Sequence, residues 1–237
     1  MSQAIGVMAQ APIPGRCKTE LLAAHGAEWV AGLCSAMLRD TLDGLQSVTA
    51  DDYFVFLAPV PRLPGEDTDD EVLAQLAIDV LGRHVPAPWE LVAQTGADQG
   101  ALVEHAFTTM FARGATYALL AAGDAPSVPT EPIAEAVANA TRATAGGEVL
   151  IGPSEDGGYY VIGMSENEPR LMRDIPWSTP AILDTTRLRC REAGLTIREL
   201  PKWYVVREPS DVLKLLDEVR KHPERAPRTA QFLVMQA

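Results

Sequence analysis

The side chains best suited to chemistry lie in three loops, each of which follows an expected β-strand. They are Arg16 and Lys18 in the segment 10–19, Asp124 in the segment 123–128, and Asp156 in the segment 152–158. In open α/β sheets, ligands bind beyond the carboxyl ends of the strands, so we expect these side chains to converge on one cleft. Cations and carboxylates gathered there would suit a phosphorylated ligand and a divalent metal ion.

The first loop has the composition of an anion-binding turn. Its sequence from Ala9 to Thr19 is AQAPIPGRCKT, in which Pro12 and Gly15 help to fix an irregular turn. Backbone N–H groups in such a turn can point at an anion. Arg16 offers a planar fork that suits phosphate, and Lys18 offers a compact charge. The spacing differs from a P-loop, and an ordinary surface turn with two solvated cations is the alternative.

Asp124 is a candidate metal ligand. The apolar run 116–122 is typical of a central strand buried on both faces, and it delivers Asp124 into a loop that contains Pro126. A hard divalent cation such as Mg²⁺ takes oxygen ligands and often bridges a carboxylate to substrate phosphates. The alternative is that Asp124 only caps its turn.

The segment GPSEDGGYY at 152–160 is the most specific pattern in the chain. Gly157 and Gly158 let the backbone approach a ligand closely. Asp156 could bind metal, orient a sugar hydroxyl or act as a base; a tight acidic turn is the alternative. Trp177 could stack on a base or a sugar, although an aromatic residue beside a helix more often belongs to the core.

The elements that must position these loops alternate between strand and helix. This alternation predicts a mostly parallel central sheet covered on both faces, a three-layer α/β sandwich that forms one domain over 1–237 with a short extension at about 222–237. Strands are expected at 4–9, 53–58, 89–93, 116–122, 149–152, 159–163 and 196–200, and helices at 27–45, 71–81, 98–112, 131–140 capped by Thr130, 180–193 capped by Thr179, and from Pro209 onward.

The composition of the chain limits the classes of molecule that it is expected to bind. A net charge of −12 argues against general nucleic-acid binding, whereas a local group of cations can still hold one small anion. No run of about 18 apolar residues occurs, so no membrane partner is expected. The N-terminus is typical of a strand rather than a signal peptide, and three widely spaced cysteines favour reduced thiols in the cytoplasm.

These loops resemble those of a bacterial family of glycosyltransferase-A-like proteins once described only as a domain of unknown function. That family is similar to molybdopterin-guanylyl and phospholactate-guanylyl transferases. The first loop resembles the family's Lys-x-Pro-x-x-Gly-x-x-Lys-Thr-Arg-Leu, and the acidic loop resembles Gly-x-Asp-x-Pro-x-Leu. The matching residues are Pro12, Gly15, Arg16, Lys18, Thr19 and Leu21 in the first loop, Asp124 and Pro126 in the second, and nearly all of 152–160 in the third.

The resemblance implies a glycosyltransferase-A or nucleotidyltransferase-like fold, a nucleotide-activated donor, and Mg²⁺ or Mn²⁺ as cofactor. It also implies roles for individual residues. Phosphate would be held by Pro12, Gly15, Arg16, Lys18 and Thr19; metal by Asp124; and donor or acceptor by Gly157, Gly158, Tyr159 and Trp177, with Asp156 and Lys18 as the catalytic pair.

The chain departs from the family pattern at four charged positions. Gln10 and Glu20 stand where the family has Lys and Arg, so two cations are missing from the expected phosphate cradle. Near the C-terminus the family has Asp-Val-Asp, and here Val205 and Arg207 replace both carboxylates. In this fold the first of those carboxylates commonly lies near the metal.

A metal site of two carboxylates would therefore lack a ligand. The ion would bind weakly, or Asp156 or Glu208 would substitute, or Arg207 would replace the metal's charge by pairing directly with phosphate. Asp211 remains, but at the first turn of a helix it has an ordinary electrostatic role.

Three functions follow from these residues. The first is transfer of a glycosyl group from a nucleotide sugar to a small-molecule acceptor. The second joins a nucleoside triphosphate to a phosphorylated small molecule and releases pyrophosphate; the first loop suits it equally well. The third is a member that has lost catalysis and binds a ligand or a protein partner, as the four departures would allow.

Overall fold

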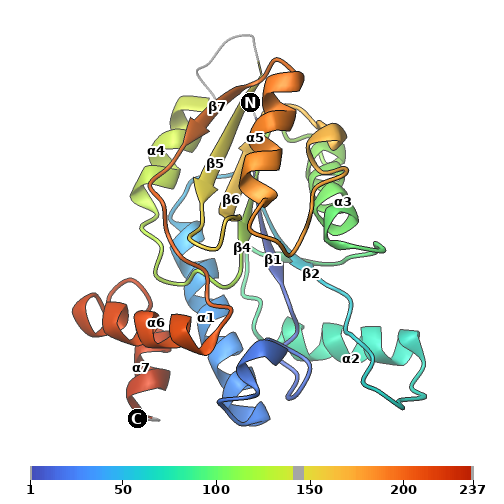
Figure 1. Ribbon diagram of the computed structural model, residues 1–237, viewed down its shortest axis with the longest axis vertical. Coiled ribbons are helices and arrows are strands. Elements are labelled where there is room, and N and C mark those ends of the chain that lie inside the picture. The colour runs from blue at the N-terminus through green and yellow to red at the C-terminus, as the bar shows by residue number, and fades with distance from the viewer. Residues whose placement is uncertain (1, 141–146, 236–237) are drawn as a thin grey trace.

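A seven-stranded sheet forms the centre of the protein in the computed structural model, which describes residues 2–140 and 147–235 (Figure 1). The strands lie in the order β3-β2-β1-β4-β6-β5-β7. Their bounds are β1 Gln3–Ala9, β2 Asp52–Leu57, β3 Glu90–Ala93, β4 Tyr117–Ala122, β5 Glu148–Pro153, β6 Tyr159–Met164 and β7 Thr196–Glu199.

The sheet is mostly parallel, as the alternation of elements predicts. β1 pairs in parallel with β2 and with β4, β2 pairs in parallel with β3, and β5 pairs in parallel with β7. Only β6 runs antiparallel to its neighbours, β4 and β5. The connection from β5 to β6 spans only 154–158, which is too short for the crossover that a parallel pair requires, so the two strands form a hairpin.

Helices cover both faces of this sheet and complete the three-layer sandwich (Figure 1). α1, α2 and α4 contribute to one apolar cluster, whereas α3 and α5 contribute to the cluster on the opposite face. The helices, including two short 3-10 turns, are η1 Thr19–Leu21, α1 Ala27–Gln46, α2 Asp70–Gly82, α3 Gln99–Ala112, α4 Glu131–Ala140, η2 Pro169–Leu171, α5 Ile182–Glu192, α6 Pro209–Lys221 and α7 Pro227–Met235.

Alternation along the strands decides which residues face each layer. In β2, Phe54 and Phe56 pack toward α3 and α5, whereas Val55 and Leu57 pack toward α1, α2 and α4. Successive side chains of a strand point to opposite faces, so a strand buried on both sides must be apolar throughout. This is why the central segments of the sequence are continuous apolar runs.

The carboxyl ends of β1, β4 and β5 lie at the same edge of the sheet because these strands run in the same direction. At the end of β4 the chain turns sharply against β1. A Cβ atom on Gly123 would lie 2.6 Å from the carbonyl oxygen of Met8, and the Gly123 N–H donates to that same oxygen over 3.0 Å. Glycine is therefore required where the loop of Asp124 leaves the sheet.

The C-terminal segment, expected as a short extension at about 222–237, contains the helix α7. α7 packs on α1, and the two helices share an apolar cluster with α6. Asp40 of α1, whose side chain is 0% exposed, accepts a hydrogen bond of 2.7 Å from the N–H of Thr229. This tertiary contact, rather than a strong local pattern, stabilises a helix of only 9 residues.

The other elements fall within a few residues of their predicted bounds. The largest shift is at α5, which begins at Ile182 rather than at Pro180. The hydroxyl of Thr179 accepts from the N–H of Ala181 over 3.3 Å, so this stretch forms a turn before the helix. Within residues 2–140 and 147–235, no helix is both long enough and apolar enough to cross a bilayer.

Candidate functional site

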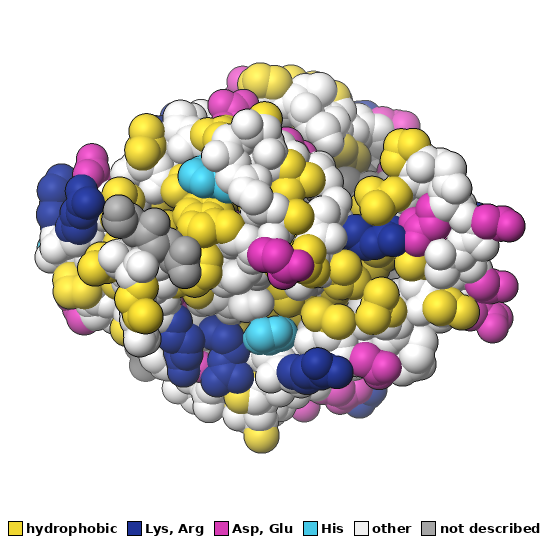
Figure 2. Space-filling model, turned by 90° about the horizontal axis from the view of Figure 1, so that it is seen from below, with side chains coloured by type: hydrophobic (Ala, Val, Ile, Leu, Met, Phe, Trp, Pro, Cys, Tyr) yellow, Lys and Arg dark blue, Asp and Glu magenta, His cyan; other side chains and the backbone are white. Residues whose placement is uncertain are grey.

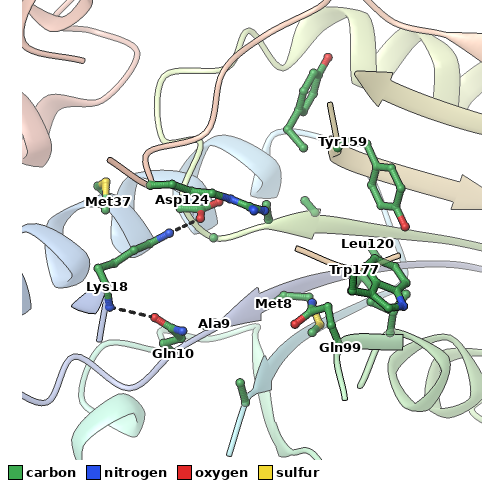
Figure 3. Close-up of a pocket in the computed structure, with 18 of the residues that line it drawn as sticks. Met8, Ala9, Gln10, Lys18, Met37, Gln99, Leu120, Asp124, Tyr159 and Trp177 are labelled. Carbon is green, nitrogen blue, oxygen red and sulfur yellow. Dashed lines mark hydrogen bonds and ion pairs between the residues drawn. The ribbon is translucent and has the colours of Figure 1, made fainter. Parts of the chain in front are cut away.

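The three loops meet around a cavity of about 310 Å³, which we call the central cavity (Figure 3). It opens at the carboxyl edge of the sheet, where strand direction places the loops together. Charged and aromatic groups from separate parts of the chain share its wall. The residues that line it include Gln10, Lys18, Asp124, Gly158, Tyr159, Trp177 and Arg207.

An ion pair between Lys18 and Asp124 crosses the charged part of the central cavity (Figure 3). The Lys18 ammonium contacts Oδ2 of Asp124, and the two side chains are only 15% and 18% exposed. The other carboxylate oxygen, Oδ1, is buried and has no hydrogen-bond partner among the described residues. The pair thus contains one satisfied and one unsatisfied carboxylate oxygen.

Lys18 is held by its backbone on both sides. Its φ of 45° lies in the left-handed region, which is uncommon for a residue other than glycine. Its N–H donates to Oε1 of Gln10 over 3.2 Å, and its carbonyl accepts from the N–H of Leu21 over 2.9 Å. Gln10 therefore fixes the residue that carries the charge, although it supplies no charge itself.

Arg16 does not reach the central cavity, contrary to the phosphate-binding role expected from the sequence. Its guanidinium makes a bidentate pair with Glu66, at 2.7 and 2.5 Å, and also donates to the carbonyl of Pro61 over 3.1 Å. The hydrogen bonds from Arg16 lower the pKa of Glu66 from 4.5 to about 2. A carboxylate from a distant loop thus occupies the planar fork that was expected to receive phosphate.

Three other residues of the first loop also lie outside the wall of the central cavity. Pro12 is buried, Thr19 is exposed at the start of η1, and Gly15 adopts a positive φ of 78°. None of these three lines the central cavity as the structure describes it. The first loop therefore presents Lys18 to the cavity, with Gln10 beside it.

Asp156 lies beside the central cavity and stabilises its own turn. Its Oδ1 accepts from the hydroxyl of Ser154 and, over 3.1 Å, from the N–H of Gly158. Its Oδ2 pairs with Nε of Arg207 over 3.2 Å. Asp156 lines a second hollow of about 430 Å³, which also involves Glu208 and Lys214.

The two glycines after Asp156 are required by close packing. Gly157 has a φ of 85°, and a Cβ atom there would lie 2.2 Å from the carbonyl oxygen of Pro180. Gly158 is buried and lines the central cavity. The Asp-Gly-Gly sequence thus allows the turn to pack closely against the segment that precedes α5.

Aromatic side chains form the less polar part of the central cavity (Figure 3). Tyr159 and Trp177 make an edge contact with ring centroids 6.4 Å apart. Burial raises the pKa of Tyr159 above its ordinary value. Of the four residues predicted to contact donor or acceptor, Gly158, Tyr159 and Trp177 line the cavity, whereas Gly157 does not.

Arg207 joins the central cavity to the second hollow, since it lines both. The segment before it is tied to the two acidic loops: the N–H of Val206 donates to the carbonyl of Asp124 over 2.9 Å, and the N–H of Glu155 donates to the carbonyl of Trp203 over the same distance. Arg207 itself is 49% exposed. Arg207 thus faces the site, at a position where the sequence resemblance implies a carboxylate.

Neither Glu208 nor Asp211 supplies the missing carboxylate to the central cavity. Glu208 and Asp211 form a capping box at the start of α6, in which Asp211 accepts from the N–H groups of Arg207 and Glu208. The ordinary role expected for Asp211 at a helix start is confirmed. Val205 is buried in the core.

The acidic residues fit a divalent ion only in a limited way. Within the described residues, no group of three or more His, Cys, Asp or Glu side chains could hold a metal ion. Asp124 and Asp156 each pair with a cation of the protein. The buried free oxygen of Asp124 could still bind an ion that takes its other ligands from water and substrate phosphates, as Mg²⁺ commonly does.

Comparison with known proteins agrees with this architecture. Residues 65–179 match the model of a family described as "Uncharacterized protein conserved in bacteria (DUF2064)". This match includes the loops of Asp124 and Asp156 and excludes the first loop and Arg207. No curated protein sequence matches the chain.

Solved structures share the fold over nearly the whole chain. A protein of Desulfovibrio desulfuricans G20, named a "putative nucleotide-diphospho-sugar transferase", is 26% identical with a TM-score of 0.81; the match covers 99% of this chain and 95% of that one. A nucleotidyl transferase from Methanothermobacter is 16% identical with a TM-score of 0.57, over 93% and 99% of the two chains. A CMP-2-keto-3-deoxy-manno-octonic acid synthetase, solved with CTP, is 12% identical with a TM-score of 0.53, over 94% and 100%.

These similarities confirm the resemblance drawn from the sequence motifs. The order of the strands, the family match and the agreement with the solved structures lead to one assignment. The chain is a protein of the glycosyltransferase-A and nucleotidyltransferase-like fold that carries the sequence pattern of the DUF2064 family over residues 65–179.

Proposed function

We propose that this protein transfers a glycosyl group from a nucleotide sugar to a small-molecule acceptor. The observation that carries the proposal is the pair of Lys18 and Asp124 at the junction of the three loops, beside the aromatic wall of the central cavity. The similarity to the Desulfovibrio protein, whose name gives a nucleotide-diphospho-sugar as substrate, supports the donor class.

In this proposal Lys18 binds the phosphates of the donor. The bond between the sugar carbon and the phosphate oxygen breaks with its electron pair passing to that oxygen, and the acceptor oxygen bonds to the carbon and passes its proton to the carboxylate of Asp156, which acts as the base. Negative charge develops on the leaving phosphate, where a preorganised ammonium stabilises it, usually the largest catalytic contribution. A bound divalent ion at Asp124 would supply further positive charge.

The aromatic wall and Asp156 would position the transferred group and the acceptor. Tyr159 and Trp177 offer apolar faces that can pack on a sugar ring or a base. Asp156 lies where Arg207 connects the central cavity with the second hollow, so we assign it to an acceptor hydroxyl. When the pair between Arg207 and Asp156 separates, Arg207 would pair with a phosphate or with the acceptor.

A thermal-shift screen tests the proposal. Nucleotide sugars and nucleoside triphosphates are each measured with Mg²⁺, with Mn²⁺ and with EDTA. Stabilisation by at least one nucleotide sugar supports glycosyl transfer, because a ligand that binds only the folded state raises the melting temperature. Stabilisation by triphosphates alone would instead indicate a nucleotidyltransferase.

A matched pair of variants makes the screen specific. Lys18→Met removes the ammonium from the central cavity, whereas Lys221→Met removes an exposed ammonium at the end of α6. The stabilisation should decrease for the first variant and persist for the second. A wild-type protein that responds to no nucleotide would favour the third function, a member that has lost catalysis.

A further inference from the structure

The two carboxylate oxygens of Asp124 have different surroundings. Oδ2 contacts the Lys18 ammonium, and Oδ1 is buried without a partner among the described residues. A divalent ion at this carboxylate would therefore lie next to the ammonium. Two cations on one small carboxylate repel each other, and the repulsion is strong where solvent is largely excluded.

No other arrangement of described side chains relieves this conflict. Asp156 is already bound by Arg207 and by its own turn. Glu20 lines the central cavity but is exposed, and no third carboxylate joins it and Asp124 in a group that could hold a metal ion. The free protein thus offers an incoming ion a single carboxylate that is already neutralised.

The two partners differ in mobility. The backbone of Asp124 is fixed between β4 and the C-terminal segment, because its carbonyl accepts from the N–H of Val206. Lys18 is fixed only at its backbone, and its ammonium lies at the end of four flexible carbons. When the pair separates, the ammonium moves and the carboxylate remains in place.

We propose that Lys18 and a divalent metal ion compete for Asp124, so that Lys18 closes the metal site in the free protein. Phosphate oxygens of a bound donor would draw the ammonium away and at the same time supply the ligands that the ion lacks. This second step rests on the proposed function, whereas the competition itself depends only on the pair that the free protein contains.

The test measures binding of Mn²⁺ alone to the full chain, by electron paramagnetic resonance of the free ion and by isothermal titration. Wild type, Lys18→Met, and the double variant Lys18→Met/Asp124→Asn are compared at neutral pH. Lys221→Met controls for the loss of one positive charge from a chain whose net charge is −12.

We expect wild type and Lys221→Met to bind Mn²⁺ weakly and alike. Lys18→Met should bind one ion at least about tenfold more tightly than wild type, because an adjacent cation is gone. The double variant should lose this gain, since the ligand itself has been removed. Lys18→Gln serves as a second variant if Lys18→Met does not fold, and circular dichroism checks each protein.

Two results would overturn the proposal. Wild type that binds Mn²⁺ as tightly as the Lys18 variants would show that Lys18 does not close the site. Folded Lys18 variants without a gain would show that Asp124 is no metal ligand even when it is released. Because no nucleotide is present, either result leaves the proposed donor class to be judged by the thermal-shift screen alone.

Discussion

Arg16 and Lys18 lie two residues apart in one loop and have different partners. The planar fork of Arg16 is filled by Glu66, whereas the single ammonium of Lys18 reaches Asp124 in the central cavity. A bidentate pair leaves few donors for another ligand, whereas an ammonium has three donors and exchanges partners readily. We therefore assign phosphate binding to Lys18 and a positioning role in the loop to Arg16.

Lys18→Ala is expected to weaken nucleotide binding by about 1–3 kcal/mol, the size of a charge-assisted hydrogen bond, without unfolding the protein. Isothermal titration with the nucleotide that gives the largest thermal shift would measure the loss. Arg16→Gln is the matched comparison and should change affinity less, because Arg16 lies outside the central cavity. Equal losses from both variants would contradict this division of roles.

The pair of Arg16 and Glu66 should make stability depend on pH in acid. The pKa of Glu66 is lowered from 4.5 to about 2 in the folded protein by its hydrogen bonds with Arg16. A lowered carboxyl pKa stabilises the folded state above the ordinary pKa, and this stabilisation is lost as the pH falls toward the folded value.

Urea unfolding between pH 7 and pH 3 would measure this dependence. The free energy of unfolding of wild type should fall more steeply below about pH 4.5 than that of Glu66→Gln. Glu135→Gln, at an exposed position of α4, should keep the slope of wild type. Parallel curves for wild type and Glu66→Gln would show that the pair is absent in solution.

Arg207 should reduce the influence of a divalent ion on ligand binding. It lines the same cavity as Asp124, so its positive charge disfavours an ion bound there, and its pair with Asp156 and its exposure to solvent reduce the repulsion. We expect nucleotide affinity to persist in EDTA, and Arg207→Asp to increase the effect of Mg²⁺. A loss of nucleotide binding by wild type in EDTA would refute this expectation.

At the scale of elements, the turn after β4 decides where Asp124 lies. The chain leaves the strand at Gly123, which presses against the backbone of β1 at Met8. The C-terminal segment then holds Asp124 from the other side through Val206. Neither contact involves the carboxylate itself, so the backbone positions Asp124 before any ligand arrives.

Gly123→Ala should destabilise the protein by roughly 1–3 kcal/mol, because the new Cβ would lie 2.6 Å from a carbonyl oxygen that cannot move freely. Gly44→Ala is the control in the interior of α1, where the nearest atom would be at 3.5 Å. It should stabilise the helix by about 0.5–1 kcal/mol. Urea unfolding of both variants would show opposite signs, and destabilisation by Gly44→Ala alone would contradict this interpretation.

At the scale of the whole molecule, α1 connects two parts of the core, because it packs on the sheet and on the C-terminal helices (Figure 1). The molecule carries a net charge of −12, yet the view in Figure 2 shows cationic, acidic and apolar side chains interspersed over one face. Binding of a small anion therefore depends on local cations such as Lys18, because the overall field repels it.

The attachment of α7 to α1 can be tested at Asp40. Asp40→Asn should reduce the free energy of unfolding by about 1–3 kcal/mol, because a buried carboxylate that accepts hydrogen bonds from the start of α7 loses its charge. Asp40 also pairs with Arg228 of α7, which forms a second, partly exposed pair with Asp43; Asp43→Asn should therefore cost less than about 1 kcal/mol. Similar costs would indicate that the buried contact contributes no more than the surface one.

The amino-acid sequence by itself determined the elements and the edge of the sheet at which the site lies. Apolar runs and helical spacing are local patterns, so they predicted the main strands and helices to within a few residues. The direction of parallel strands then placed the loops of Lys18 and Asp124 at one edge, and the structure joins these two residues directly. The sequence motifs also indicated the family resemblance, which the family match over residues 65–179 supports.

Only the tertiary structure decided which side chains pair. Arg16 pairs with a glutamate 50 residues away, and Asp156 pairs with Arg207, which lies just before α6. The antiparallel β6 and the docking of α7 likewise depend on neighbours that no local pattern specifies. Periodicity reports which face of an element is buried, whereas the partner of a charge follows from how distant segments pack, so no local pattern identifies Glu66 as the partner of Arg16.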